Sequence, residues 1–296
     1  MTIGVIGLGT MGLPIAEHLH ERYGGVTGYD VSADRRAILA ERGLAVTDDL
    51  QSLAANDVLV LLLPNSAIVE AVLLAPELFS ALRAGTRVLD MSSSEPLRTI
   101  ALAEKLRARQ VTLIDAPVSG GLRGALAATL TIMVGSTPED YTFVKGFVQP
   151  LGTAVHVGSV GSGHLLKALN NYLSATHLIA TAEAMSAGRA FGLDPAVMID
   201  VFNSSSGRSG STQAKWPQFI APGNYASGFS LDLMTKDLGI ALDAATTLGT
   251  ATEVARVIHQ LWAQAQAELP AGSDHTRIAE WVDHGESGEP VAEWRE

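Results

Sequence analysis

The sequence contains no cysteine, and this absence removes several kinds of chemistry. A disulfide framework, a thiol nucleophile and a thiolate metal site all require cysteine, so none of them can occur here. The sequence also has no uninterrupted apolar run near the eighteen or so residues that a membrane helix needs. The run from Val58 to Leu63 has only the length of a buried strand. We therefore expect no association with a membrane.

Positive charge is also scarce. Lysine and arginine number 20 against 31 aspartates and glutamates, which gives a net charge of −11. Binding of nucleic acid requires a basic surface, so we expect no nucleic-acid partner. An anionic small molecule would have to be bound by single cations placed at its site. The lack of cysteine, and a first strand that leaves no room for a signal peptide, favour a cytoplasmic location.

The first half of the chain alternates short apolar runs with helical patterns, and 47% of all residues are hydrophobic. Such alternation predicts a mostly parallel, doubly wound sheet with helices on both faces. The predicted strands are Ile3–Ile6, Val26–Tyr29, Val58–Leu62, Arg87–Asp90, Thr112–Asp115, Thr131–Val134 and Ala154–Val157. The predicted helices between them include Pro14–Arg22, Asp34–Arg42, Ser66–Leu74 and Arg98–Arg109.

The most specific pattern lies in the first thirty residues. The first strand runs directly into Gly7-Leu8-Gly9-Thr10-Met11-Gly12, and a helix follows. Gly7 permits a tight turn, Gly9 lets a pyrophosphate approach the backbone, and Gly12 allows close packing of helix and strand. The pattern predicts dinucleotide binding at the N-terminus of that helix.

The second predicted strand ends at Asp30, eighteen residues beyond Gly12. A carboxylate at this position bonds the free 2′-hydroxyl of an adenosine ribose and repels a 2′-phosphate. We therefore expect NAD to be favoured over NADP, although Arg35 and Arg36 follow closely in the sequence.

Beyond about Gly163 the alternation gives way to long Ala/Leu-rich helical patterns. These predict helices over Leu165–Phe191, Pro195–Phe202, Leu231–Leu248 and Thr252–Ala267. We expect three regions: a Rossmann-type NAD(P)-binding domain over 1–160, an all-helical substrate and dimerisation domain over 161–285, and a frayed polar tail over 286–296.

A glycine-rich segment, Asp115-Ala-Pro-Val-Ser119-Gly120-Gly121, follows the predicted strand 112–115. It would lie at the edge of the sheet where open α/β folds bind ligands. Consecutive amides of Ser119, Gly120 and Gly121 can bind a carboxylate, and the serine hydroxyl adds a donor. An ordinary glycine-rich turn explains the segment equally well.

Two lysines stand near the starts of predicted helices. Lys167 and Asn171 are four residues apart and share one helix face. A cation at a helix N-terminus is unfavourable for the macrodipole, whereas a desolvated lysine can donate and accept a proton. A surface lysine beside a capping asparagine is the simpler explanation from these residues alone. Lys236 is either a solvated cation or a residue that reaches the cofactor cleft.

Other kinds of site have little support. The histidines, among them His164, lack metal-ligand spacing, so we expect no metal and structural roles for them. No Gly-x-Ser-x-Gly elbow supports a serine nucleophile. The serines at Ser204–Ser206 and Ser209–Ser211 predict a flexible loop.

Together these segments resemble the β-hydroxyacid dehydrogenase family of the 3-hydroxyisobutyrate dehydrogenase and tartronate semialdehyde reductase type. The resemblance covers nearly the whole chain and favours a functional role for both lysines over the simpler explanations. It rests on five motifs in the family's order, which are Gly7–Pro14, Asp115–Gly121, Gly161–Asn171, Ala182–Ala184 and Lys236–Leu238.

The resemblance implies an NAD(P)-dependent oxidoreductase that interconverts a small 3-hydroxy carboxylic acid, similar to 3-hydroxyisobutyrate, and its semialdehyde. Lys167 matches the catalytic general acid/base and Asn171 the amide that orients the substrate. Lys236 matches a lysine that lines the cofactor and substrate cleft. The residues matching the carboxylate-binding loop are Ser119, Gly120 and Gly121, and those matching further cofactor contacts are Leu63, Pro64 and Ser93. We expect a homodimer or homotetramer.

Departures from the family pattern bear on the substrate. The related 6-phosphogluconate dehydrogenases carry a glutamate where this chain has Ser174, so we expect oxidation without decarboxylation. Ser93 replaces a threonine and keeps its hydroxyl. Arg123 and Arg208 are candidates for binding a second anionic group, but we expect both to be solvated. The identity of the hydroxy acid stays open.

Two alternatives remain. One is an imine reductase on the same scaffold, but such enzymes usually lack the lysine at position 167 and prefer NADPH. The other is a non-catalytic NAD-binding module. Relatives of that kind have lost the same lysine.

Overall fold

The computed structural model describes residues 1–284. Contacts between residues divide the chain into two compact units, Met1–Ala168 and Leu169–Glu296. The tail predicted over 286–296 lies outside the described residues. No helix in the described part of the chain has both the length and the apolar character needed to cross a membrane.

Unit 1, Met1–Ala168, is built on a nine-stranded sheet with the order β3-β2-β1-β4-β5-β6-β8-β7, and β9 pairs with β8. The run from β3 to β6 is parallel, as predicted, whereas β8 is antiparallel to β6 and β7. The strands are β1 (Ile3–Ile6), β2 (Val26–Tyr29), β3 (Ala45–Thr47), β4 (Val58–Leu61), β5 (Arg87–Asp90), β6 (Thr112–Asp115), β7 (Val118–Ser119), β8 (Leu130–Gly135) and β9 (Gly152–Gly158).

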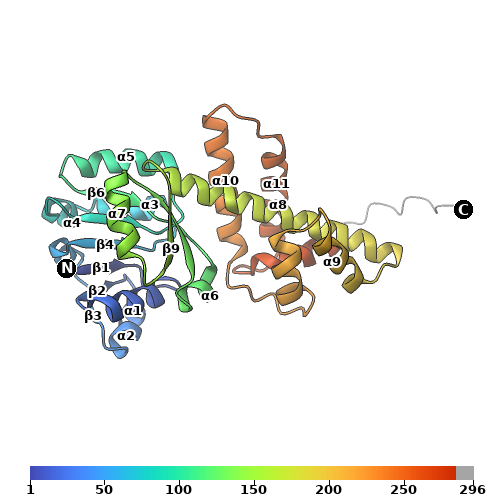
Figure 1. The fold of residues 1–296 in the computed structure, drawn as a ribbon, viewed down its shortest axis with the longest axis horizontal. Helices are drawn as coiled ribbons and strands as arrows, with labels where there is room; N and C mark the ends of the chain where they lie inside the picture. Colours follow the sequence, from blue (N-terminus) through green and yellow to red (C-terminus); the bar gives the residue numbers. More distant parts are fainter. Residues whose placement is uncertain (285–296) are drawn as a thin grey trace, which may run out of the picture. The chain divides into compact units, whose positions relative to one another are not determined.

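Strand β4 shows how the sheet buries both faces. Val58 and Val60 belong to one apolar cluster, whereas Leu59 and Leu61 belong to another, as the two-residue repeat of a strand requires. Helices cover both faces (Figure 1). The first cluster includes residues of α1 (Gly12–Tyr23), α2 (Ala33–Glu41), α6 (Gly121–Leu126) and α7 (Pro138–Phe147). The second includes residues of the 3₁₀ helix η1 (Leu50–Ala55) and of α3 (Ser66–Leu73), α4 (Pro76–Ala81) and α5 (Pro96–Arg107).

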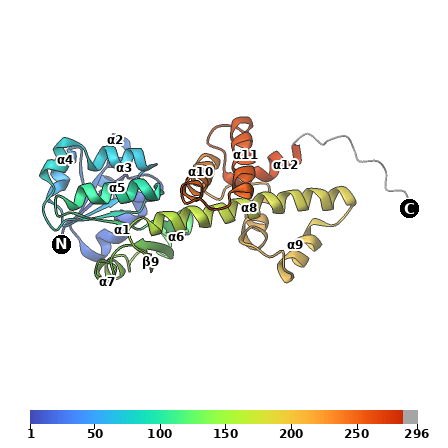
Figure 2. The same cartoon turned by 90° about the horizontal axis from the view of Figure 1, so that it is seen from above.

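The described part of unit 2 is helical apart from its connections, as predicted. It begins within α8 (Ser162–Phe191), a continuous helix of 30 residues (Figure 2). Its apolar core includes the fully buried Trp262 and Met185. The other helices are α9 (Pro195–Ser204), the π-helix η2 (Ser211–Ile220), α10 (Leu231–Thr247), α11 (Glu253–Glu268), the 3₁₀ helix η3 (His275–Arg277) and α12 (Ile278–His284).

The loop expected over the serines is present but shorter than predicted. Ser204 is the last residue of α9 and Ser211 begins η2, so residues 205–209 form the connection. The amide of Ser209 donates to Thr212 Oγ1 at 2.9 Å, and the amide of Thr212 donates to Ser209 Oγ at 3.3 Å. Serine and threonine hydroxyls favour such local bonds to the backbone, and here these bonds fix the start of a helix.

Candidate functional site

The carboxyl ends of four parallel strands in unit 1 bring the predicted cofactor residues to one edge of the sheet. The strand order reverses beside β1, with β2 on one side and β4 on the other. Open α/β sheets bind ligands at such a switch point, outside the carboxyl ends of the strands. The segments that follow β1, β2, β4 and β5 are Gly7–Gly12, Asp30, Leu63–Pro64 and Ser93.

The three glycines of the first turn differ in what surrounds them. A Cβ on Gly7 would overlap the carbonyl oxygen of Leu62, and φ of Gly7 is 96°. A Cβ on Gly12 would overlap the carbonyl oxygen of Gly7. A Cβ on Gly9 would meet no described atom within 4 Å. The fold itself therefore requires two of the glycines, whereas Gly9 leaves open space beside the backbone, as a bound pyrophosphate needs.

Asp30 ties the end of β2 to the glycine turn. Its Oδ2 accepts a hydrogen bond from the amide of Leu8 at 2.7 Å, and its Oδ1 accepts one from the amide of Ser32 at 2.9 Å. An ionised carboxylate has about four acceptor sites, so Asp30 can also accept bonds from a ribose diol. Arg36 Nη1 donates to the carbonyl oxygen of Asp30 at 2.6 Å. The guanidinium of Arg36 thus lies at the same strand end.

The loops after β4 and β5 are joined by serines. Ser92 Oγ accepts a bond from the amide of Leu63 at 2.9 Å. The buried Asp90 accepts from the amide of Ser92 at 3.0 Å and from Ser94 Oγ at 2.9 Å. Ser93 lies between these two fixed serines and is half-buried. Its hydroxyl is therefore held on an ordered loop at the edge of the sheet.

The predicted carboxylate loop follows β6. Ser119 ends β7 and is half-buried, and Gly120 and Gly121 have φ values of 128° and 58°. Only glycine adopts two such conformations in succession at low cost. A Cβ on Gly121 would meet no described atom within 4 Å, so this turn also faces open space.

Asp115, the last residue of β6, holds the opening of α8. Its Oδ1 accepts from the amide of Gly161 at 2.7 Å, and its Oδ2 accepts from the amide of His164 at 2.9 Å. Burial raises the pKa of the Asp115 carboxyl above its usual value, while His164 and the bonded amides act in the opposite direction. A Cβ on Gly163 would overlap the carbonyl oxygen of Met133 and the carboxylate of Asp115, which explains the second glycine of the motif. The strand that leads to Ser119 therefore also anchors the helix that carries Lys167.

Within unit 2, a buried aspartate orients the predicted substrate amide. Asn171 Nδ2 donates to Asp237 Oδ2 at 2.5 Å, and both side chains are buried. An ionised carboxylate only accepts hydrogen bonds, so the NH₂ group of Asn171 faces Asp237. Lys236 Nζ lies 3.3 Å from Asp237 Oδ1. Asp237 therefore contacts both Asn171 and Lys236, two residues that the sequence analysis singles out.

A second lysine of unit 2, Lys215, was not identified from the sequence and bonds to a residue of the helix that carries Asn171. Lys215 of η2 donates from Nζ to Ser174 Oγ at 2.6 Å. Ser174 is the residue from which the sequence analysis expects oxidation without decarboxylation. Arg123 and Arg208, the two cations considered for a second anionic group, are exposed.

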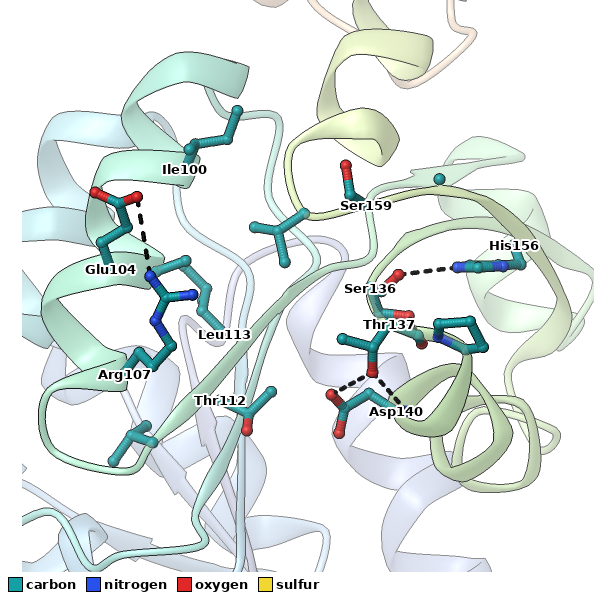
Figure 3. Close-up of a pocket in the computed structure, with 15 residues that line it drawn as sticks. Ile100, Glu104, Arg107, Thr112, Leu113, Ser136, Thr137, Asp140, His156 and Ser159 are labelled. Carbon is teal, nitrogen blue, oxygen red and sulfur yellow. Dashed lines mark hydrogen bonds and ion pairs between the residues drawn. The ribbon is translucent and has the colours of Figure 1, made fainter.

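Unit 1 also has a hollow whose lining includes none of the predicted site residues (Figure 3). It lies beside β6, which pairs with β8 through a single pair of residues. Its polar groups bond one another: Thr137 Oγ1 donates to Asp140 Oδ2 at 2.9 Å, and His156 Nε2 lies 3.0 Å from the carbonyl oxygen of Ser136. The described residues also include no cluster of three metal-ligating side chains.

Asp237 and Lys215 are the two residues that sequence reasoning missed. The motif Lys236-Asp237-Leu238 contained a signal for Asp237, since a charged residue beside an apolar one in a helix needs a partner when it is buried. Lys215 gave no such signal. Its segment, Ala214–Pro217, ends in a proline, which is more typical of the end of a helix than of a binding site.

The two halves of the chain match two family models. Residues 2–161 match the model described as the NAD binding domain of 6-phosphogluconate dehydrogenase. Residues 161–282 match the model described as NAD-binding of NADP-dependent 3-hydroxyisobutyrate dehydrogenase.

Individual proteins match over most of the chain. The 2-(hydroxymethyl)glutarate dehydrogenase of Eubacterium barkeri is 40% identical over 82% of this chain and 81% of that protein. A probable mitochondrial 3-hydroxyisobutyrate dehydrogenase of Dictyostelium discoideum is 34% identical over 95% of this chain and 91% of its own length. The solved structure of Mycobacterium tuberculosis 3-hydroxyisobutyrate dehydrogenase with L-serine has a TM-score of 0.89 at 28% identity, covering 95% and 98% of the two chains.

These matches confirm the predicted family, and together with the sheet and helices they confirm the predicted fold class. They also confirm the expected class of enzyme, an NAD(P)-dependent 3-hydroxyacid dehydrogenase. The chain belongs to the β-hydroxyacid dehydrogenase family, in the group that includes 3-hydroxyisobutyrate dehydrogenase.

Proposed function

We propose that the protein oxidises a small 3-hydroxy carboxylic acid to its semialdehyde, or catalyses the reverse reduction, with Lys167 as the general acid/base. This proposal rests on one observation: the backbone amides of Gly161 and His164, at the start of α8, both donate hydrogen bonds to the carboxylate of Asp115. Through them one strand supports both the loop Ser119–Gly121 and the helix of Lys167. We propose 1–160 as the cofactor-binding domain and 161–285 as the substrate and dimerisation domain.

The residues at the sheet edge fit a dinucleotide. The open space at Gly9 admits a pyrophosphate, and Asp30 has acceptor capacity for a ribose diol. Leu63, Pro64 and Ser93 would complete the contacts. When bound, NAD(P) supplies the group that accepts or returns a hydride.

The residues of the protein itself would bind and orient the substrate and transfer its hydroxyl proton. The amides of Ser119–Gly121 bind the substrate carboxylate, and Lys236 adds positive charge. The amide of Asn171, oriented by Asp237, positions the hydroxyl group. The amine of Lys167 takes the hydroxyl proton during oxidation and returns it during reduction. Ser174 offers no carboxylic acid to assist loss of CO₂, so the product keeps its carboxylate.

We propose NAD as the preferred cofactor, because the Asp30 carboxylate would repel a 2′-phosphate. The position of Arg36 at the same strand end limits the expected preference, since its guanidinium could approach such a phosphate. We also propose a cytoplasmic location, in keeping with the absence of cysteine.

The test is the initial rate of NADH formation with a panel of small 3-hydroxy acids, with NADP run in parallel. The panel includes 3-hydroxyisobutyrate, glycerate and 2-(hydroxymethyl)glutarate, the compound for which the Eubacterium barkeri relative is named. Turnover of one or more members, faster with NAD, is the expected result. If no hydroxy acid supports NADH formation while NADH still binds, the result would contradict the proposal and favour imine reduction or a non-catalytic role.

The glycines give a matched pair of variants. Gly9→Ala should leave the free energy of unfolding nearly unchanged and weaken NADH binding by about tenfold or more, because the added methyl group occupies only the ligand's space. Gly12→Ala should lower the free energy of unfolding by about 1–3 kcal/mol, because its methyl group overlaps Gly7. Thermal unfolding and NADH fluorescence titration measure the two effects. Equal loss of stability in both variants would contradict this division.

We propose that the protein forms a homodimer or homotetramer through unit 2. Val197 and Val201 lie one turn apart on α9 and are 60% and 53% exposed, and Phe191 at the end of α8 is 82% exposed. Apolar side chains grouped in this way mark an association surface. Light scattering at micromolar concentration should show a dimer or tetramer, and Val197→Asp with Val201→Asp should shift it towards monomer. A monomeric wild-type protein would refute the proposal.

A further inference from the structure

The contact between Lys215 and Ser174 places a cation beside the proposed substrate site. Lys215 Nζ lies 2.6 Å from Ser174 Oγ, and both side chains are half-buried. Ser174 lies three residues beyond Asn171 on α8, so the two side chains share a face of the helix. The ammonium group therefore lies about one helical turn beyond the amide that positions the reacting hydroxyl.

The spacing along α8 sets the length of a substrate that would reach both groups. At 1.5 Å per residue, Asn171 and Ser174 are separated by about 4.5 Å along the helix axis. An extended carbon chain advances about 1.25 Å per bond because of its tetrahedral angles, so this distance corresponds to three or four carbon–carbon bonds. A group held by Lys215 would thus lie three or four bonds beyond the carbon that bears the hydroxyl.

The helix that carries Lys215 is unusual and well anchored. Its buried residues are Ser211, Thr212, Trp216 and Ile220; Trp216 follows Ser211 by five positions, and Ile220 follows Trp216 by four. Asn203 Nδ2 donates to the carbonyl oxygen of Thr212 at 3.2 Å and fixes the first turn to α9. The π-helix is rare in proteins, and where it occurs as a short bulge it is frequently at a functional site.

A second polar group lies on the same helix as Lys215. Ser211 Oγ is buried and has no hydrogen-bond partner among the described residues. Ser211 precedes Lys215 by four positions, close to one turn of a π-helix. A buried hydroxyl without a partner is costly unless a ligand or water bonds to it.

We propose that Lys215, positioned by Ser174, binds a second carboxylate of the substrate, so that the enzyme selects dicarboxylic 3-hydroxy acids over monocarboxylic ones. This inference rests on the proposed function. Lys215 is a specificity-determining residue and takes no part in proton or hydride transfer. A charged hydrogen bond in a half-buried site supplies the selectivity, whereas the exposed Arg123 and Arg208 would be screened by solvent.

The test compares kcat/KM for 2-(hydroxymethyl)glutarate with that for 3-hydroxyisobutyrate, a dicarboxylate and a monocarboxylate with the same reacting group. Wild-type protein should favour the dicarboxylate by about tenfold to a hundredfold, the usual effect of one charged hydrogen bond. Lys215→Met should bring the ratio close to one, mainly through KM for the dicarboxylate, and Lys215→Arg should restore part of it. Arg208→Met, which removes an exposed cation of unit 2, should leave the ratio unchanged.

The outcomes separate this inference from the proposed function. If the wild-type protein oxidises 3-hydroxyisobutyrate with no preference for the dicarboxylate, the inference fails and the proposed function stands. If neither acid nor any other panel member is oxidised, the proposed function itself fails. Equal losses with both acids in Lys215→Met would show that Lys215 only joins η2 to α8, and would overturn the inference. Loss of the preference in Arg208→Met instead would assign the second carboxylate to Arg208.

Discussion

Replacement of Lys167 with alanine is expected to lower kcat by about a hundredfold to ten-thousandfold, the usual contribution of a general acid/base. The proposed mechanism has no other group that takes the hydroxyl proton, because Asn171 cannot titrate and Ser174 is no acid. NADH binding should change little, since the proposed dinucleotide contacts are at Gly7–Gly12, Asp30 and the loops after β4 and β5. Steady-state rates and NADH fluorescence titration measure the two effects.

A matched control and a rescue experiment sharpen the test of Lys167. Lys145→Ala removes an exposed lysine of α7 and should retain full activity. Addition of a small alkylamine to Lys167→Ala should restore part of the rate, because the amine supplies the missing proton acceptor. If Lys167→Ala keeps more than about a tenth of the wild-type kcat, the assignment of Lys167 as general acid/base is wrong.

Replacement of Asp115 with alanine is expected to lower the free energy of unfolding by about 2–4 kcal/mol, because two buried amides at the opening of α8 lose their acceptor. Relief of the cost of burying the carboxylate offsets part of this loss. Asp49→Ala, which removes an exposed N-cap of η1, should cost only about 1 kcal/mol. Denaturant unfolding of both variants measures the difference, and equal losses would contradict the anchoring role.

The raised pKa of Asp115 also has a consequence for pH dependence. Between the usual value of 3.8 and the raised value, the folded chain keeps a proton that the unfolded chain has lost. This group therefore makes folding stability fall as pH rises through that window. Asp115→Asn cannot titrate, so the variant should lack this contribution. Unfolding curves at several pH values will show it as a difference in slope between variant and wild type.

Most of the sheet could be predicted from the sequence because each strand follows from a local pattern. Six of the predicted strands lie within one residue of the observed bounds at each end, and β9 extends two residues earlier than predicted. Strands β3 and β7 have three and two residues, which is too short for a periodic signal. Helix α7 was not predicted, although Thr137 before Pro138 is a start signal for a helix.

The missed part of the site depends on contacts between distant residues. The glycine turn was predictable because all of its parts lie within thirty residues and each glycine has a local conformational reason. Asp237 meets Asn171 across 66 residues, and Lys215 meets Ser174 across 41. Periodicity and capping rules do not predict which helix faces pack together. These two contacts could therefore be identified only from the structure. The π-helix η2 was missed for a related reason, since its repeat matches neither helical nor strand spacing.

With Lys215 in its proposed role, the π-helix offers a route by which substrate choice can diverge in evolution. One residue inserted into an α-helix widens a turn to the i→i+5 pattern, and one residue deleted restores the narrower turn. Loss of a single codon from the first turn of η2 would rotate Lys215 by about 100° around the helix axis. Helix α8, with Lys167 and Asn171, would keep its sequence. A descendant gene could thus acquire a new acid as substrate through one small deletion while inheriting the hydride-transfer chemistry intact.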